Sequence, residues 1–216
     1  MRKESNSSVK SSKISNGVKE IIVATRNKDK VKEIRRILKD LNVKIRPLNN
    51  FKDIPKIVED GATFEENASK KAKIISKFTQ RLTIADDSGL EVDVLGGKPG
   101  VKSSRFAGEK ASYNENNAKL LKLLQGVSYS KRSARFVCVI SVAKDGKVLN
   151  VVRGTCRGKI GFAPKGKTGF GYDPLFVSPK YGRTFAELGP TIKNRISHRY
   201  RALEKAKGAI KRLLDF

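Results

Sequence analysis

The segment from Arg135 to Arg153 constrains the fold of this chain more than any other stretch of its sequence. Two β-prone runs, Arg135 to Ala143 and Lys147 to Arg153, are joined by Asp145-Gly146, a dipeptide favoured in tight hairpin turns. The sequence therefore predicts an antiparallel hairpin within a larger sheet. The longest apolar run, eight residues from Phe136 to Ala143 with one serine among them, is far short of the roughly 20 that cross a bilayer, so we expect no membrane span.

Short strands and helices alternate before the hairpin. Ile21 to Ala24 is β-prone, helical spacing begins at Val31, and Val43 to Ile45 predicts a second strand. Thr63 and Glu66 form a capping-box pattern that opens a helix to about Lys77. Further expected elements are a strand at 82–85, a turn at 96–100, a helix at 116–124, a Gly-rich segment at 158–171 and an amphipathic helix at 202–213. This order predicts an α/β fold with a mixed, helix-covered sheet in one domain at residues 18–216, after a disordered Ser/Lys-rich tail at residues 1–17.

Charge is the most unusual property of the composition. Lys and Arg number 47 against 21 Asp and Glu, which gives a formal net charge of +26. A surface this basic attracts polyanions, so a basic nucleic-acid-binding protein is the alternative to an enzyme. Residues 53–93 depart from the trend with nine acids against six bases, a local net charge of −3. That window is either a pocket for a divalent cation that holds a phosphorylated ligand or a solvated helix face.

The few cysteine and histidine residues restrict the kinds of metal site and the cellular compartment that we expect. Cys138 and Cys156 have no CxxC spacing, and the chain has a single histidine, so the usual structural zinc sites are excluded. The start of the chain lacks the apolar block of roughly 7 to 15 residues found in a signal peptide. We expect a cytoplasmic protein with two free thiols.

The loop after the first strand is the first predicted binding segment. Backbone N–H groups at a helix N-terminus, together with a hydroxyl, an amide and an ammonium group, suit a triphosphate. The residues concerned are Thr25, Arg26, Asn27, Lys28, Asp29 and Lys30. The alternative is a simple helix cap at Asn27, and the lack of Walker glycines excludes a P-loop.

Glu59 and the pair Asp86-Asp87 are the predicted metal-binding carboxylates. Neighbouring residues of a strand point to opposite faces, so one aspartate can bind a metal ion while the other meets a supporting group or a second ion. Mg²⁺ takes only one or two carboxylates when substrate phosphates complete its shell, so this sparse set is sufficient. The alternative for Asp86 to Gly89 is a plain turn, because all these residue types favour turns.

Two further groups complete the candidate site. Lys71, on the capped helix with Glu66, Asn67 and Lys70, could reach phosphates from the side opposite Lys30, although such lysines are usually solvated. An aromatic ring flanked by glycines can stack on a nucleobase, and Arg or His can donate to its carbonyl oxygen. The predicted base-binding residues are Phe170, Gly171, Tyr172, Asp173, Lys193, His198 and Arg199. The lone histidine could equally be structural.

Together and in this order, these motifs resemble the inosine triphosphate pyrophosphatase family. The matching segments are Thr25 to Lys30, Glu59 to Ala68, Ala85 to Leu90, Gly169 to Pro174 and Lys193 to Arg199, and the resemblance covers about residues 20–214. Tyr200 stands where the family usually has glycine.

The resemblance implies a fold, a reaction and roles for residues. The fold would be an elongated mixed central β-sheet flanked by two α/β lobes, with the active site in the cleft between them, usually as a homodimer. The reaction would be Mg²⁺-dependent hydrolysis of ITP, dITP and XTP to the monophosphate and pyrophosphate, which removes deaminated purines from the nucleotide pool. Glu59 and Asp87 match the family's metal-binding carboxylates, Asp87 its general base, and Ser88 a substrate contact. Asp86 would support the ion.

Selectivity follows from hydrogen-bond chemistry. Hypoxanthine and xanthine present a carbonyl acceptor at position 6, where adenine presents an amino donor. Donors from His198 and Arg199 would therefore favour the deaminated bases over adenine. Guanine shares the carbonyl, and no residue of the sequence accounts for its rejection.

Overall fold

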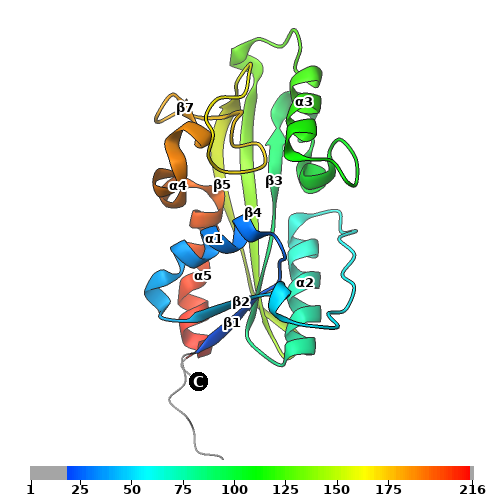
Figure 1. The fold of residues 1–216 in the computed structure, drawn as a ribbon, viewed down its shortest axis with the longest axis vertical. Coiled ribbons are helices and arrows are strands. Elements are labelled where there is room, and N and C mark those ends of the chain that lie inside the picture. Colours follow the sequence, from blue (N-terminus) through cyan, green and yellow to red (C-terminus); the bar gives the residue numbers. More distant parts are fainter. Residues whose placement is uncertain (1–18, 215–216) are drawn as a thin grey trace, which may run out of the picture.

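The computed structural model describes residues 19–214, so the tail expected at residues 1–17 lies outside the described residues. Its strands form one seven-stranded sheet in the order β2-β1-β3-β4-β5-β6-β7. The strands are β1 (Glu20–Val23), β2 (Lys44–Pro47), β3 (Thr83–Val92), β4 (Ser133–Lys144), β5 (Lys147–Ile160), β6 (Phe176–Ser178) and β7 (Arg183–Thr184). The helices are α1 (Lys28–Ile37), α2 (Phe64–Thr79), α3 (Tyr113–Leu123), α4 (Phe185–Ile196) and α5 (His198–Leu214). The mixed, elongated α/β sheet is confirmed (Figure 1).

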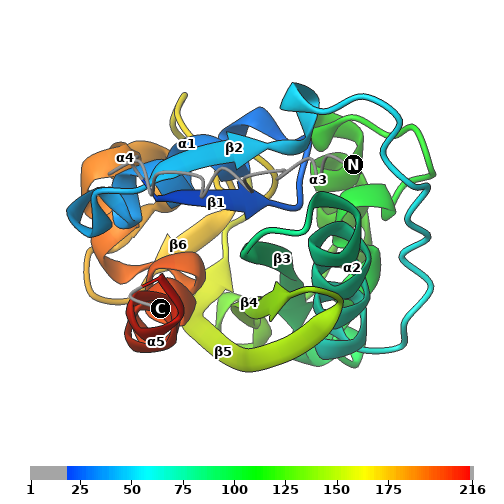
Figure 2. The same ribbon diagram turned by 90° about the horizontal axis from the view of Figure 1, so that it is seen from below.

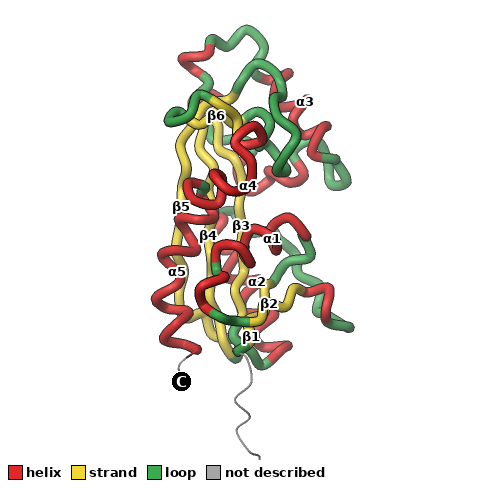
Figure 3. The backbone as a smooth tube through the Cα atoms, turned by 60° about the vertical axis from the view of Figure 1, so that its left-hand side comes forward, coloured by secondary structure: helices red, strands yellow, loops and turns green. Residues whose placement is uncertain are grey.

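The sheet has a parallel part and a longer antiparallel part. β2, β1 and β3 run parallel, whereas β3, β4, β5, β6 and β7 pair antiparallel in sequence. The predicted hairpin joins β4 to β5, and Asp145 and Gly146 have φ values of 50° and 76°, as a two-residue hairpin turn requires. β3, β4 and β5 run through most of the length of the molecule (Figure 3).

Helices cover both faces of the parallel part of the sheet. Successive strand residues point to opposite faces, and both faces carry apolar side chains. Ile84 of β3 and Cys138 of β4 pack in one core with α1 and α5, whereas Ala85 packs against Ala72 and Ile75 of α2 on the other face. Figure 2 shows α5 and α2 on different sides of the curled sheet. At the far end, α3 and α4 enclose a second core with Leu90, Phe136 and the segment around Phe176. Two lobes therefore share one continuous sheet.

Helix signals were accurate at α2 and incomplete at α4. The capping box of Thr63 and Glu66 is present, and α2 ends at Thr79 rather than at Lys77. α4 was not predicted, although Thr184 and Glu187 form the same kind of capping box.

Two strands run farther than their sequences suggest. β3 does not end at Ala85, since Ser88, Gly89 and Leu90 pair with β4, so the alternative of a turn at these residues is wrong. Strand pairing here overrides the turn preference of these residue types. β5 likewise continues through Gly154 and Gly158 into the segment that the sequence placed in a Gly-rich stretch.

Gly154 is required by a close helix contact. A Cβ atom at this position would lie 2.3 Å from the carbonyl oxygen of His198 and 2.4 Å from the backbone nitrogen of Ala202. The first turn of α5 therefore packs directly on the backbone of β5. No helix among residues 19–214 is long and apolar enough to cross a membrane.

Candidate active site

A cleft of about 600 Å³ lies between the two lobes, where β1 leaves the sheet. β1 pairs with β3 only as far as Ile84, so Asp86 and Asp87 follow at the edge of this opening. Of the predicted residues, Thr25, Arg26, Asn27, Lys30, Glu59, Lys71, Asp87, Ser88, Phe170, Gly171, Tyr172, Asp173, Lys193, His198 and Arg199 line the cleft. Asp86, Lys28 and Asp29 do not, and Lys28 is exposed.

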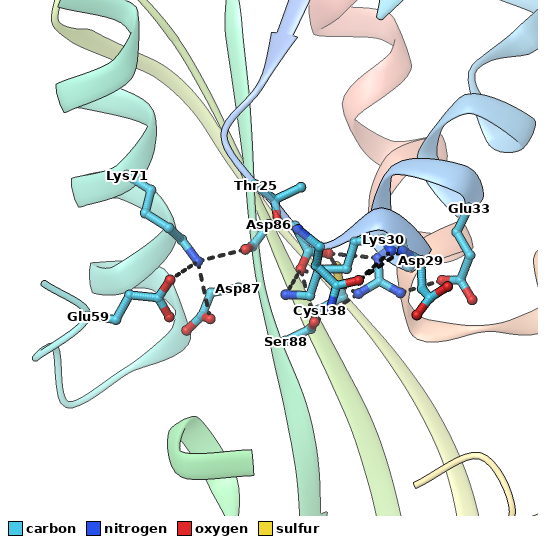
Figure 4. A network of polar contacts seen from close by, with 12 residues as sticks. Thr25, Asp29, Lys30, Glu33, Glu59, Lys71, Asp86, Asp87, Ser88 and Cys138 are labelled. Carbon is cyan, nitrogen blue, oxygen red and sulfur yellow. Dashed lines mark hydrogen bonds and ion pairs between the residues drawn. The ribbon is translucent and has the colours of Figure 1, made fainter. Parts of the chain in front are cut away.

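Asp87 points to the α2 face of β3, where Lys71 meets it. The Nζ atom of Lys71 donates to Oε1 of Glu59 at 2.9 Å, to the backbone oxygen of Asp86 at 2.8 Å and to Oδ1 of Asp87 at 3.4 Å (Figure 4). Lys71 is buried, so the expectation of a solvated lysine is wrong here, whereas Lys70 is partly exposed and pairs with Asp60. Oδ2 of Asp87 has no hydrogen-bond partner among the described residues.

Burial raises the pKa of Asp87 despite the positive charges of Lys71 and Lys30. A carboxylate with a raised pKa and a free oxygen has the properties of a general base.

Asp86 points to the opposite face and is fully occupied by protein donors. Its carboxylate accepts from Lys30 Nζ at 2.5 Å, from Arg199 Nε at 2.8 Å, from Ser88 Oγ at 2.9 Å and from Cys138 Sγ at 3.0 Å. Burial alone would raise the pKa of Asp86, but Arg199 and Lys30 outweigh it and hold the pKa well below its usual range. This aspartate is therefore a permanent anion between α1 and α5.

Glu33 extends this ion cluster and was missed by the sequence analysis. Its buried carboxylate accepts from Arg199 and lies 2.7 Å from Lys193 Nζ, which also pairs with Asp173. Burial alone would lower the pKa of Lys193, but Asp173 and Glu33 outweigh it and raise it. The available signal was spacing, because Glu33 follows Lys30 by one helical turn on α1.

The loop before α1 forms the cap that was the alternative prediction. Asn27 Oδ1 accepts from the backbone nitrogens of Asp29 at 2.9 Å and Lys30 at 3.1 Å. Two of the helix N–H groups expected to face a triphosphate are thus bound within the loop. The Nδ2 atom of Asn27 donates to the hydroxyl of Tyr113 at 3.1 Å. This hydrogen bond links the start of α1 to α3 across the cleft.

The aromatic end of the cleft lies around Phe170. The Phe170 ring is 6.0 Å from that of Tyr113, and Lys193 Nζ lies 4.6 Å from its centroid. His198 stacks on Phe136 at 4.7 Å, and its Nδ1 atom has no partner among the described residues. Burial, with the nearby charges of Arg199 and Lys193, lowers the pKa of His198 well below its usual value, so the imidazole is neutral.

Arg199 has fewer free donors than the sequence suggests. Its Nε atom donates to Asp86, Nη1 to Glu33 and Nη2 to Ser88 Oγ at 2.9 Å. A guanidinium group carries five N–H donors, and a second contact of Nη2 with Asp86 at 3.4 Å leaves one hydrogen on Nη1. Reading of a base by Arg199 stays a prediction, restricted to that hydrogen.

The carboxylate oxygens of Glu59 and Asp87 in the cleft fit a small hard cation as ligands. No cluster of three or more potential ligands occurs within residues 19–214, but these two carboxylates converge on one ammonium group and Asp87 has an unpartnered oxygen. Mg²⁺ commonly takes one or two protein carboxylates and completes its shell with water and phosphate. The support of the ion by Asp86 stays a prediction. Both oxygens of Asp86 already accept hydrogen bonds from protein donors.

Known proteins similar to this chain point to one family. A model of the Ham1 family matches residues 21–209. A dITP/XTP pyrophosphatase of Geobacillus kaustophilus is 50% identical over 188 residues, 87% of this chain and 92% of that protein. One from Shouchella clausii is 47% identical over 191 residues, 88% of this chain and 96% of that protein. The solved structure of a Ham1 protein from Coxiella burnetii has a TM-score of 0.80 at 42% identity and covers 90% of this chain and all of its own. The Staphylococcus aureus Ham1 protein gives 0.79 at 38% identity, over 89% of this chain and 98% of that one.

Proposed function

The chain belongs to the Ham1 family, and from that premise we propose that it hydrolyses the deaminated purine nucleoside triphosphates dITP, ITP and XTP to the monophosphate and pyrophosphate. The observation that carries the proposal is Asp87, a buried carboxylate with a raised pKa and one free oxygen in a cleft rich in cationic groups. The cellular role is removal of deaminated purines from the nucleotide pool.

Asp87 is the proposed general base. A water molecule attacks the α-phosphorus and transfers a proton to Oδ2 of Asp87, while the bond from that phosphorus to the bridging oxygen breaks and pyrophosphate leaves. The burial that raises the pKa of Asp87 makes it a stronger base, and Lys71 holds its other oxygen in place. Arg26, Lys30 and Lys71 line the cleft and offset the charge of the leaving pyrophosphate.

Glu59 and Asp87 would hold the Mg²⁺ that we propose as cofactor. When bound, the ion draws charge from the phosphate oxygens. Lys71 contacts both carboxylates, so it orients them toward each other before the ion and substrate arrive. Asp86 takes a different part, because it fixes Lys30 and Arg199 through its ion pairs.

The base would bind between Phe170 and the buried groups of α4 and α5. His198 is neutral and can donate one N–H to the 6-carbonyl of hypoxanthine or xanthine, and Arg199 has one hydrogen left on Nη1. Adenine presents an amino donor at this position, so binding it would leave a buried donor unpaired. ATP is therefore rejected.

Measuring pyrophosphate release from dITP, ITP, XTP, ATP and GTP with Mg²⁺ tests the proposal. We expect release from the first three and the matching monophosphate as product. The variant His198→Phe keeps the stacking on Phe136 but removes the donor, so it should narrow the ratio of ITP to ATP rates. No release from dITP, ITP or XTP would contradict the proposed function, and an unchanged ratio would remove His198 from base recognition.

The setting of the enzyme is proposed with its reaction. The two thiols, Cys138 and Cys156, are free and buried, as suits a cytoplasmic protein acting on the nucleotide pool. We propose a homodimer as the working form, which sedimentation equilibrium of the full chain tests directly.

A further inference from the structure

Acidic residues are scarce in the half of the sequence that holds neither Asp86 nor Asp87, so its positive charge is less balanced. Between Asn116 and Tyr172 the sequence has twelve Lys and Arg and a single acid, Asp145. Asp145 lies at the tip of the β4–β5 hairpin, beside Gly146, whose backbone nitrogen donates to Ser76 of α2. At the opposite end of these strands, beyond α3 at the top of Figure 1, the segment from Asn116 to Lys144 supplies no acid, and Glu91 and Asp93 of β3 pair there with Arg135.

Two adjacent exposed aromatic rings at this end are flanked by cations. Tyr129 and Phe162 are 42% and 64% exposed, and their ring centroids are 6.0 Å apart. Lys159 Nζ lies 4.9 Å from the centroid of Tyr129, and the Arg132 guanidinium lies 4.2 Å from that of Phe162. In the row Lys159, Tyr129, Phe162, Arg132, two adjacent aromatic rings thus lie between two positive charges.

Arg132 fixes the row in place without neutralising its charge. The guanidinium donates to the backbone oxygens of Leu124 at 2.7 Å, Val127 at 3.0 Å and Gly161 at 2.9 Å. These acceptors are neutral carbonyl groups, so the positive charge remains. Arg132 is buried, which makes it the rigid support of the more exposed Phe162.

Further bases surround the two rings. Lys122 lines a shallow groove together with Arg132 and Phe162, and Lys131 is exposed in the turn that carries Tyr129. Arg157 lies two residues before Lys159 on β5, hence on the same face. We call Lys122, Tyr129, Lys131, Arg157, Lys159 and Phe162 the distal basic surface. It shares no residue with the lining of the catalytic cleft.

We propose that the distal basic surface binds single-stranded nucleic acid. Cations attract the phosphates without regard to sequence, and exposed rings stack on unpaired bases. A duplex hides its base faces, so two adjacent exposed rings favour a single strand. This binding is separate from the hydrolysis in the cleft and does not depend on the proposed reaction.

Fluorescence anisotropy of the full chain with a labelled oligothymidylate of about 12 nucleotides tests the proposal. The double variant Tyr129→Ala/Phe162→Ala should weaken binding by about 30-fold or more, because each stacked base contributes substantially. Tyr181→Ala is the matched control, since Tyr181 is 38% exposed with Lys180 at 5.6 Å from its ring centroid but lies outside the surface. The control should bind like the wild type.

Salt dependence tests the charged part of the surface. The variant Lys131→Gln/Arg157→Gln should reduce the slope of log affinity against log salt by about 1.4, or about 0.7 for each lost phosphate contact on a single strand. An abasic oligomer of the same length keeps the phosphates and should bind the wild type about as weakly as the thymidylate binds the double aromatic variant.

Three results would overturn the proposal. They are wild-type affinity in the double aromatic variant, equal binding of the abasic oligomer, and a change in the oligomeric state of the aromatic variant. The third would show that a second copy of the chain covers the surface. Because Tyr129 and Phe162 lie outside the cleft, unchanged pyrophosphate release by the variant confirms that it is folded.

Discussion

The two faces of β3 treat neighbouring aspartates in opposite ways. On the α1 and α5 face, Asp86 accepts from four side chains, those of Lys30, Arg199, Ser88 and Cys138. On the α2 face, Asp87 lines the cleft, meets one lysine and keeps one oxygen without a partner among the described residues. Burial acts on both, yet the pKa falls where cations surround the group and rises where they do not. Alternation along one strand thus separates a group that holds structure from one that performs chemistry.

The largest expected effect is on the open face. Asp87→Asn removes the proposed base and a cation ligand, so turnover of ITP should fall by about 10³-fold or more. The fold should be unaffected, because the substitution removes a charge whose burial is unfavourable. Steady-state pyrophosphate release and thermal unfolding of the same sample separate the two effects. Retained wild-type turnover would remove Asp87 from the mechanism.

Asp86→Asn should act mainly on stability. It leaves Lys30 and Arg199 buried without their shared carboxylate, which should lower the free energy of unfolding by about 3 kcal/mol or more. Denaturant unfolding measures the loss. Asp60→Asn is the control, because Asp60 is exposed and its pair with Lys70 should have no measurable effect. Equal stability of the two variants would contradict the structural role of Asp86.

The pH dependence of stability should have opposite signs for the two aspartates in metal-free protein. Asp86 has a lowered pKa, so its stabilisation is present above the usual value of about 3.9 and is lost only as the pH falls through the lowered one. Asp87 has a raised pKa, so wild type should lose stability relative to Asp87→Asn as the pH rises through the raised value. Unfolding free energies of wild type and both variants between about pH 3 and pH 7 in EDTA measure both trends. Parallel curves of unfolding free energy against pH would contradict the opposite effects expected for Asp86 and Asp87.

The smallest expected effect concerns the thiol that donates to Asp86. Cys138→Ala removes one of four donors and should lower the free energy of unfolding by about 1 kcal/mol, with turnover within about twofold of wild type. Cys156→Ala is the matched control, because that thiol is also buried but donates to the backbone oxygen of Arg157 rather than to a carboxylate. A cost no larger than that of the control would show that the Cys138 thiol adds nothing to the cluster.

Local rules predicted the parts of the fold that are governed locally. The hairpin at Asp145-Gly146 and the capping box at Thr63 depend on residues a few positions apart, and both are present. The extent of β3 and β5 depends on partners far along the chain. Turn-prone residues such as Ser88 and Gly89 become strand because β4 supplies their hydrogen bonds, which no window around them reveals.

The site divides in the same manner. Most of the site residues that were predicted from motifs line one cleft. Each motif positions its own side chains at the end of a strand or helix. Glu33, Tyr113 and Cys138 were missed because their roles are defined by partners on other elements, such as Arg199 for Glu33 and Asn27 for Tyr113. Apart from the spacing of Glu33 from Lys30 on α1, nothing near these residues in the sequence indicates their roles.

The continuous ladder of β3, β4 and β5 has a mechanical consequence. β3 and β4 pair through ten successive residues, from Thr83 to Val92, without a register shift, and this ladder crosses from one lobe to the other behind the cleft. A rotation of one lobe against the other large enough to break this ladder would cost a row of hydrogen bonds, so the ladder resists independent motion of the lobes. We therefore expect opening and closing around a nucleotide to involve mainly the loops that line the cleft, such as the segment at residues 54–59. Amide hydrogen exchange should accordingly be slow along the whole ladder and respond to substrate only in those loops.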